Sequence, residues 1–356
     1  MALSPVQIAA IAKGVVEVFA RLEVDLRVTA AKHIVREGVD AEAARRAIAA
    51  TGGRYSREVE RAIADAVVRS VQAANATDDV IYAAARNAGI LGPLVPATDA
   101  AIVKAIIDAG ILSAVNAGNL TATGAVLSTQ AAFTAALDRA LIETLSGTVS
   151  QTQAIRTAVD EIARFTPTVR YVAASGRVIE RSVYGAVRSA VTTAAHQTVG
   201  RVQFARADAM GVRHVEVSAH VGARPSHAEW QGQVYGYPEP FTSICGYGAV
   251  DGIYGVHCGH SAAPFLPEIM EPTDYSEVLS RDAERDYELS QRQRLCERNV
   301  REYAGRAEVY RAAGETDAAR RYEGLAAKWT GEARAVARQR GDILRLDRME
   351  PTPNFK

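Results

Sequence analysis

Hydrophobic positions recur at helical spacing through roughly the first 165 residues of the chain. The first such run contains Ile8, Ile11, Val15, Val18, Leu22 and Leu26. Positions three or four residues apart share one face of an α-helix, so we predict a helix from Ser4-Pro5 to about Gly38. Capping residues and glycines predict further helices: Asp40 to Gly52-Gly53, a helix that starts at Ser56, Thr77 to Gly89, Thr98 to Gly110, and about 125–145 and 149–164. Residues 1–165 are therefore a predicted alanine-rich helical region for partner docking or assembly.

The pattern changes in the central region, residues 166–270. A long helix is predicted from about Gly176 to Ala209, and the alternation in Val215-Glu216-Val217-Ser218 then predicts a strand. Glycine, proline, tyrosine and most of the histidines are concentrated from there to about Pro267. This composition indicates a small, loop-rich α+β module.

The final region, residues 271–356, returns to a helical pattern that is dense in arginine and glutamate. Helices are predicted from Ser276 to about Ala313 and from Glu315 to about Arg338, with a hairpin at Ala313-Gly314. These charges are expected mainly on a solvated surface, in pairs four residues apart. The predicted fold class of the whole chain is mainly α.

The composition is that of a soluble globular protein, with 48% hydrophobic and 23% charged residues. Cys245, Cys258 and Cys296 are too few for a disulfide framework, which favours synthesis in a reducing host cytoplasm. The chain starts with no signal-peptide pattern, and no run reaches the roughly 18 apolar residues that span a bilayer. We therefore expect no membrane association.

Arginines cluster between residues 164 and 213. This stretch has eight arginines, no lysine and two acidic residues, a local charge of about +6 in a chain whose net charge is +0. On the predicted long helix, four of them fall within about 40° of one another: Arg177, Arg181, Arg188 and Arg206. Three partners stay open for this face: DNA phosphates, an acidic surface on another protein, and acidic residues of the C-terminal hairpin.

Histidine and cysteine side chains in the central module are the ligand types that zinc prefers. The predicted set is His220, His227, Cys258 and His260, two from each of two loops. The alternative is a compact loop core in which these histidines bond to backbone carbonyls and carboxylates. Cofactors other than zinc are not expected.

The same segment offers a second chemistry and a set of anchors. Cys258 with His227 or His260, oriented by Glu229 or Asp251, would form the elements of a Cys-His-acid hydrolase or nuclease within residues 214–262. Three neighbouring residues are predicted to hold the module together: Arg224 by bonding loop carbonyls or Glu229, Trp230 as a hydrophobic anchor, and Gln231 beside it. No catalytic residue is assigned.

Three motifs carry a resemblance to a known family. Residues 220–232 resemble the "H-x-G-A-R-P-S-H-x-x-W-Q-G" signature of the phage minor capsid protein 2 family, and residues 252–260 its "G-x-x-G-x-[NH]-C-x-H" element. Residues 287–301 are similar to its "Y-x-x-x-Q-x-Q-R-x-x-E-R-x-x-R" helix. The order and spacing agree over roughly 180–305, and the likeness is looser in the N-terminal helices. More distantly, the arrangement resembles the Mu-type head-morphogenesis proteins.

The resemblance implies a minor structural protein of a tailed-phage head, located in the virion and present in multiple copies. Its implied partners are the portal protein, the major capsid protein or both, with packaged double-stranded DNA as a further candidate. Such a protein acts in head assembly or in DNA packaging and delivery by binding, and is not an enzyme. The alternatives are the hydrolase or nuclease described above and an internal DNA-binding virion protein.

Overall fold

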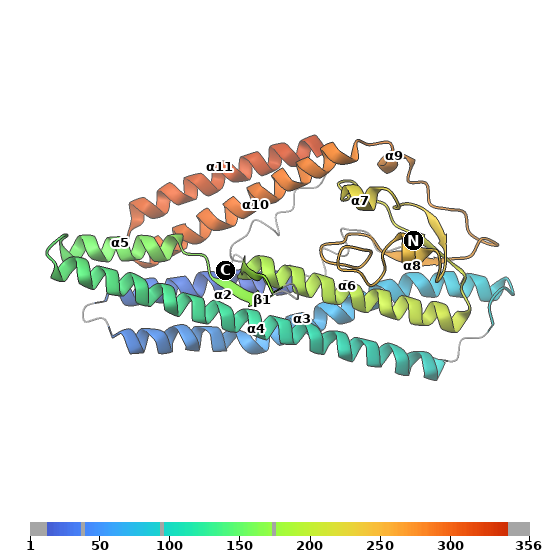
Figure 1. Cartoon of the computed structure of the whole chain (residues 1–356), viewed down its shortest axis with the longest axis horizontal. Helices are drawn as coiled ribbons and strands as arrows, with labels where there is room; N and C mark the ends of the chain where they lie inside the picture. The colour runs from blue at the N-terminus through green and yellow to red at the C-terminus, as the bar shows by residue number, and fades with distance from the viewer. Residues whose placement is uncertain (1–12, 37–39, 93–95, 173–175, 341–356) are drawn as a thin grey trace. The chain divides into compact units, whose positions relative to one another are not determined.

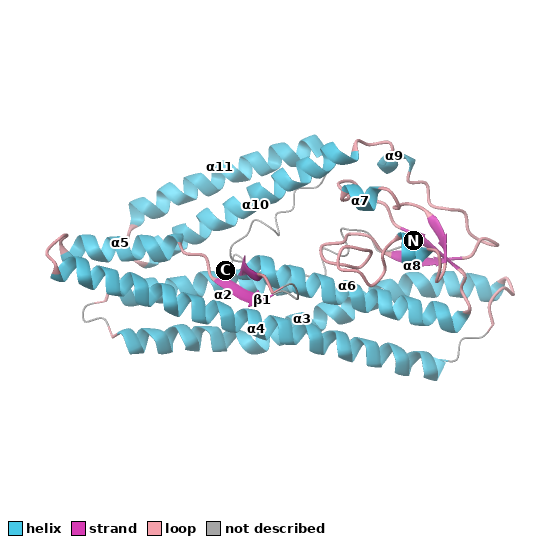
Figure 2. Cartoon of the chain, in the orientation of Figure 1, coloured by secondary structure: helices cyan, strands magenta, loops and turns pink. Residues whose placement is uncertain are grey.

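The computed structural model describes residues 13–36, 40–92, 96–172 and 176–340, and the predicted helix start at Ser4-Pro5 lies outside them. The elements are α2 (Lys13–Ile34), α3 (Ala41–Asn87), α4 (Pro96–Leu145), α5 (Gln151–Arg164), β1 (Thr168–Val172), β2 (Val178–Ser182), α6 (Val183–Met210), β3 (His214–Val217), α7 (Pro225–Ala228), β4 (Val234–Gly236), α8 (Phe241–Ile244), β5 (Ala262–Phe265), α9 (Ser276–Leu279), α10 (Ala283–Ala312) and α11 (Thr316–Arg340). Figures 1 and 2 show that helices dominate and that the strands are short. The predicted mainly α fold class is confirmed.

The chain divides into two compact units, each built from separate stretches of sequence. The module unit contains Arg61–Ala117 and Arg188–Gln291, and the bundle unit contains the described residues of Val15–Glu60, Gly118–Val187 and 292–340. The predicted division into three consecutive regions does not follow these units, because the long helices contribute residues to both.

Three predicted helix breaks are wrong. One is the helix start expected at Thr77, because α3 continues through that residue. The other two are at glycines, whose surroundings show why. Both α3 and α4 continue through glycines that were expected to end helices, Gly52 and Gly110. A β-carbon on Gly52 would lie 2.3 Å from Val126 Cγ2, and one on Gly110 would lie 2.1 Å from Thr198 Oγ1. These glycines therefore allow close approach of a neighbouring helix and are not C-terminal caps.

The predicted helix from Gly176 to Ala209 is wrong in its first turns. Residues 178–182 form β2, which pairs antiparallel with β1 from Val172↔Val178 to Thr168↔Ser182. The helix α6 begins only at Val183, and the Ser182 hydroxyl accepts the N–H of Gly185 at 3.2 Å. β-branched residues at 178 and 179 favour the strand, and the serine then starts the helix.

In the module unit a three-stranded antiparallel sheet has the order β4-β3-β5, which confirms the predicted strand at Val215. Val215 and Val217 are buried, as the alternating pattern predicts. Glu216 is buried too, which the pattern does not predict. The Glu216 carboxylate accepts the Thr273 hydroxyl at 2.9 Å and the Thr273 N–H at 2.5 Å. These two hydrogen bonds offset much of the free energy that burial of the Glu216 carboxylate costs.

Aromatic rings fill the core of the module unit. Phe204 of α6 lies 5.1 Å from Tyr237, 5.3 Å from Phe241, 4.7 Å from Tyr247 and 5.9 Å from Tyr254, measured between ring centroids. Such edge and stacked contacts add to the apolar area that these rings bury. The loops of the module therefore rest on a dense aromatic core.

The predicted C-terminal hairpin is confirmed for α10 and α11. Gly314 takes a left-handed φ of +82° at the turn between them. In the bundle unit the two helices bury Cys296, Val300 and Ala333 against Trp329. Many of their charges lie at the surface in ion pairs such as Arg311–Glu308 at 2.6 Å.

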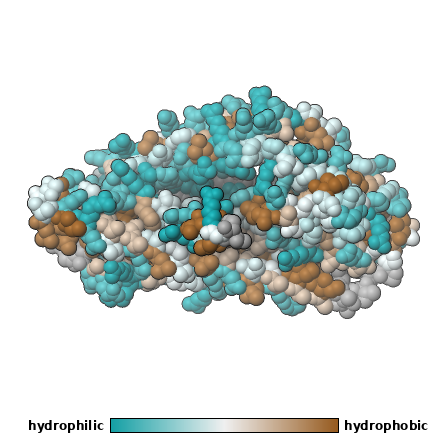
Figure 3. All heavy atoms as spheres, in the orientation of Figure 1, coloured by the Kyte–Doolittle hydropathy of each residue, from teal (hydrophilic) through white to brown (hydrophobic). Residues whose placement is uncertain are grey.

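One helix among the described residues, α4, is long and apolar enough to cross a membrane by length and composition alone. Within Ala100–Leu145 an 18-residue window has a mean hydropathy of 1.6, and only 11% of that window is buried. The expectation that no stretch is long enough is wrong here, because scattered serine, asparagine and threonine interrupt the apolar run while residues 109–137 carry no charge. Figure 3 shows hydrophobic side chains at the surface among hydrophilic ones.

Candidate functional site

The histidines and the cysteine of the predicted zinc set come from two loops of the module unit. His220 and His227 follow β3, with His227 on the short helix α7, which starts at Pro225. Cys258 and His260 directly precede β5. A β-carbon on the intervening Gly259 would lie 2.7 Å from His220 Nε2, so glycine is needed for the two loops to meet.

Three of the four predicted ligands lie together and are buried. The candidate metal group, which we define as His227, Cys258 and His260, places its ligand atoms within 4.8 Å of one another. His227 Nδ1 is 3.4 Å from His260 Nδ1, and Cys258 Sγ is 3.7 Å from His260 Nδ1. Their exposed fractions are 2% for His227, 4% for Cys258 and 0% for His260.

The far side of each imidazole in this group faces an oxygen acceptor. His227 Nε2 lies 2.6 Å from the carbonyl oxygen of Asp251, and His260 Nε2 lies 3.0 Å from Gln231 Oε1. The amide orientation of Gln231 is fixed because the same oxygen accepts the backbone N–H of His220 at 3.1 Å. A carbonyl oxygen only accepts, so both Nε2 atoms carry the proton in the neutral rings.

Burial sets the charge state of the group. Desolvation lowers the pKa of His227, and it lowers the pKa of His260 well below its ordinary value, helped by the neighbouring imidazoles. Burial also raises the pKa of the Cys258 thiol, although the His260 backbone N–H donates to Sγ at 3.3 Å. By itself the group is therefore uncharged near neutral pH.

The described residues do not form the Cys-His-acid arrangement that the hydrolase alternative predicted. A buried thiol with a raised pKa is a poor nucleophile, since the thiolate is the reactive form. Asp251 meets His227 through its backbone carbonyl, and Glu229 is exposed at the surface. Neither carboxylate orients the imidazole as the alternative requires.

His220 stands beside the group. Its ring centroid lies 4.2 Å from that of His260, and its Nδ1 lies 3.2 Å from the carbonyl oxygen of Val221. The sequence placed it among the ligands, whereas the structure gives it a ring contact with one of them.

The three predicted anchors contact the same loops. Arg224 donates to the carbonyl oxygen of Val256, which joins the first loop to the second. Trp230 is 7% exposed, and its ring lies 4.6 Å from His227 and 4.8 Å from His260. Gln231 bonds to both histidine-bearing loops, as described above. Each of the three residues thus contacts a histidine-bearing loop, and their role as anchors stays a prediction.

Sequence reasoning missed a buried polar network next to the group. Tyr254 has a φ of 60° and is 1% exposed, and its hydroxyl accepts the Ala262 N–H at 2.8 Å. The same hydroxyl donates to Gln203 Oε1 at 3.1 Å, and Gln203 Nε2 donates to the buried Asp78 carboxylate at 3.2 Å. The only sequence feature that could have indicated this network is a tyrosine between Gly252 and Gly255, and that pattern by itself indicates only a turn.

The four arginines predicted to share a helix face lie on different elements. Arg177 precedes β2 and Arg181 lies within it, whereas Arg188 and Arg206 belong to α6. Arg206 is 4% exposed, forms an ion pair with Asp79 at 2.5 Å and lies 5.3 Å from the Tyr82 ring centroid. The single basic face is therefore a wrong prediction, because strand β2 replaces the first turns of the helix and α3 covers Arg206.

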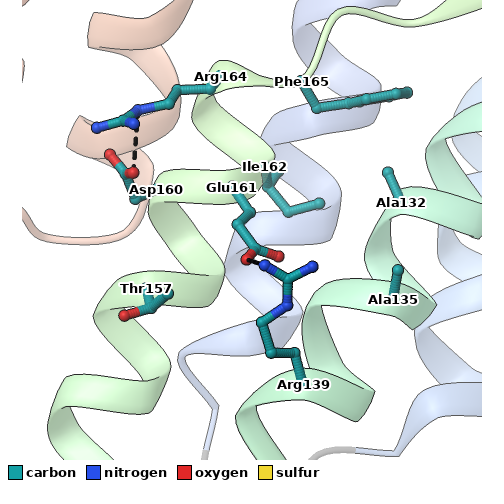
Figure 4. Close-up of a pocket in the computed structure, with 9 residues that line it drawn as sticks. All are labelled: Ala132, Ala135, Arg139, Thr157, Asp160, Glu161, Ile162, Arg164 and Phe165. Atoms are coloured by element: carbon teal, nitrogen blue, oxygen red, sulfur yellow. Dashed lines mark ion pairs between the residues drawn. The ribbon is translucent and has the colours of Figure 1, made fainter.

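A hollow of about 560 Å³ lies in the bundle unit, and Figure 4 shows the side chains that line it. Its charges are paired within the chain: Arg139 with Glu161 at 2.7 Å and Arg164 with Asp160 at 2.9 Å. Ion pairs of this kind leave little charge for a ligand, so the site is better sought in the module unit.

The family comparison agrees with the motifs. A family model described as phage minor capsid protein 2 matches residues 3–336, which include both histidine-bearing loops and most of the long helices. A search of curated proteins and a search of solved structures each gave no match. The match covers nearly the whole chain, and the chain therefore belongs to the phage minor capsid protein 2 family of virion structural proteins.

Proposed function

We propose that this protein is a portal-associated minor head protein, present in several copies, that acts in head assembly by binding other head proteins. Family membership supports the structural role in the virion. The observation that carries the binding role is the exposed apolar face of α4, which we call the α4 stripe and define as Leu112, Leu120, Leu127, Leu141, Ile142 and Leu145.

The six side chains of the α4 stripe lie on one side of the helix, where the exposed polar residues Asn116 and Asp138 lie among them. At about 100° per residue, all six side chains fall within about 60° of Leu127. They are between 56% and 77% exposed, whereas Ala136 on the opposite side is 1% exposed. A row of large apolar side chains that stays in water is typical of a surface that another protein covers.

The size of the α4 stripe is sufficient for a specific contact. From Leu112 to Leu145 the helix rises about 50 Å at 1.5 Å per residue, and a helix is about 10 Å wide. A partner helix along it would remove about 500 Å² from each side, or about 1,000 Å² in total. That is the lower limit for a specific interface.

A protein partner is favoured over lipid because polar groups of α3 bond to α4 on the same side of the helix as the stripe, at Gln130 and Thr134. Within the bundle unit, Gln130 Nε2 donates to the Arg45 carbonyl oxygen at 2.9 Å, and Arg45 Nη2 donates to Thr134 Oγ1 at 3.2 Å. Insertion of α4 into a bilayer would have to break these contacts or take charged groups with it, both of which are costly.

The proposal is tested by binding of the purified chain to purified portal protein and, separately, to purified major capsid protein. The double variant Leu120→Glu/Leu127→Glu puts two charges on the α4 stripe, and Val80→Glu, at a helical site that is 70% exposed, is the matched control. We expect portal binding to weaken at least tenfold in the double variant and to stay unchanged in the control. Portal binding that survives the double variant, or binding to the major capsid protein alone, would overturn the proposal.

A further inference from the structure

We propose that His227, Cys258 and His260 bind one zinc ion, which joins the two histidine-bearing loops of the module unit. Nothing in the proposed assembly function requires a metal, so the inference stands on the geometry of this group.

Two of the three ligand-atom distances within the group are those of ligands that share one ion, and the third, between His227 and Cys258, lies within 4.8 Å. Zinc binds imidazole nitrogen at about 2.0–2.1 Å and thiolate sulfur at about 2.3 Å, usually as a tetrahedron. Two nitrogens on one tetrahedral ion are then about 3.4 Å apart, and a nitrogen and a sulfur about 3.6 Å apart. His227 Nδ1 and His260 Nδ1 are 3.4 Å apart, and Cys258 Sγ is 3.7 Å from His260 Nδ1.

The hydrogen bonds of the two imidazoles point their lone pairs at each other. Both Nε2 atoms carry the proton, because Asp251 O and Gln231 Oε1 can only accept. Both Nδ1 atoms are therefore unprotonated in the neutral rings, and at 3.4 Å they cannot bond to each other. A thiol proton from Cys258 would satisfy only one of them, whereas a cation would satisfy all three atoms.

The outer contacts are those that stabilise a bound metal. Histidine ligands of metals ordinarily donate their second N–H to a carbonyl or carboxylate, which fixes the ring, and here Asp251 O and Gln231 Oε1 accept these bonds. The backbone N–H of His260 donates to Cys258 Sγ at 3.3 Å, which favours the thiolate. Trp230 packs against both imidazoles, which are 2% exposed in His227 and 0% exposed in His260.

The ligand types select the metal. Two imidazoles and one thiolate suit zinc better than the hard cations magnesium and calcium, which prefer oxygen ligands. The candidate metal group supplies three ligands, and water or the adjacent His220 would complete the coordination. Since one pair of ligands lies in the second loop and His227 in the first, the ion would link the loops directly.

Zinc content and spectroscopy of the full chain test the inference. The purified chain is stripped with a chelator, incubated with Zn²⁺ alone, freed of excess metal and assayed by elemental analysis, with Co²⁺ alone as a spectroscopic probe in parallel. We expect one zinc per chain, and with cobalt the intense absorption of a sulfur-to-metal charge transfer. Cys258→Ser should abolish that band, and His260→Gln should lower the zinc content at least tenfold.

Cys245→Ser is the matched control, because Cys245 is a second buried thiol of the same module that lies outside the group. It should keep both the zinc and the cobalt band. If a ligand variant fails to fold, the wild-type chain still tests the inference. A chelator should lower the melting temperature of the wild type, and added Zn²⁺ should restore it. A folded wild-type chain that holds no more zinc than Cys258→Ser, or a Cys245→Ser variant that loses the cobalt band, would overturn the inference.

Discussion

Replacement of Asp78 by asparagine tests the buried polar network of the module unit. Asp78 lies on α3 with no exposed surface, and both of its carboxylate oxygens accept from Gln203 Nε2, at 3.2 and 3.3 Å. Burial raises its pKa to about 7, although the Gln203 bond and the Arg206 charge act in the opposite direction. Asparagine has the same shape and keeps one acceptor for Gln203, so the substitution removes mainly the ionisation.

The shift fixes how stability depends on pH. The folded-state pKa of Asp78 lies above the unfolded value of 3.8, so between about pH 4 and pH 7 the folded chain keeps a proton that the unfolded chain has lost. The contribution of Asp78 to the free energy of unfolding is therefore largest at low pH, falls as the pH rises through this window, and is constant above about pH 7. The difference between a pKa of 3.8 and one of about 7 corresponds to roughly 4 kcal/mol of stability, which is an upper bound.

The assay compares the free energies of unfolding of the wild type and Asp78→Asn by urea denaturation at about pH 4.5 and about pH 8. Other groups cancel in the difference, so the variant should gain about 2–4 kcal/mol relative to the wild type between the two pH values. Asp65→Asn, at an exposed site on the same helix, should change by less than about 0.5 kcal/mol. A pH-independent difference between wild type and Asp78→Asn would refute the reasoning.

Three further predictions concern packing, anchoring and nucleic acid. Gly52→Ala should destabilise the chain by about 1–3 kcal/mol in urea denaturation because its β-carbon would meet Val126. Gly53→Ala, which has open space around it, should stabilise the chain by about 0.5–1 kcal/mol. Equal effects of the two substitutions would contradict the close approach of α3 and α4. Trp230→Ala should lower the unfolding free energy by about 3–5 kcal/mol in the same assay, and a loss below 1 kcal/mol would mean that Trp230 is no anchor. For arbitrary duplex DNA, a plot of the logarithm of the binding constant against the logarithm of the salt concentration should have a slope shallower than about −1. A slope near −3.6, as expected for four phosphate contacts, would support a face shared by the four arginines.

The sequence predicted those parts of the fold that depend on local chemistry. Gly314 and the charged helices beside it define the C-terminal hairpin, and the alternation around Val215 predicts β3. These signals are local, because a turn glycine or an alternating strand acts on its neighbours in sequence.

The errors arose where a tertiary contact decides the role of a residue. Gly52 and Gly110 resemble helix ends in sequence, but each meets a side chain on a distant segment, Val126 or Thr198, that the sequence does not place. Arg206 lies on the predicted basic face by helical spacing, but in the structure it forms an ion pair with Asp79 and contacts the ring of Tyr82.

The candidate metal group was predicted only in part for the same reason. Residue types and loop spacing indicated His227, Cys258 and His260, since soft ligands in pairs are recognisable in sequence. The placement of His220 outside that group depends on how its ring packs on His260, which spacing does not determine.

The central claim, that this chain is a structural component of the phage head, is tested most directly by quantitative mass spectrometry of purified mature particles. Particles should contain the chain at a fixed ratio to the portal subunit, with several copies per portal, after washes that remove unassembled protein. A chain that is abundant in the lysate of infected cells and absent from the particles would contradict the claim.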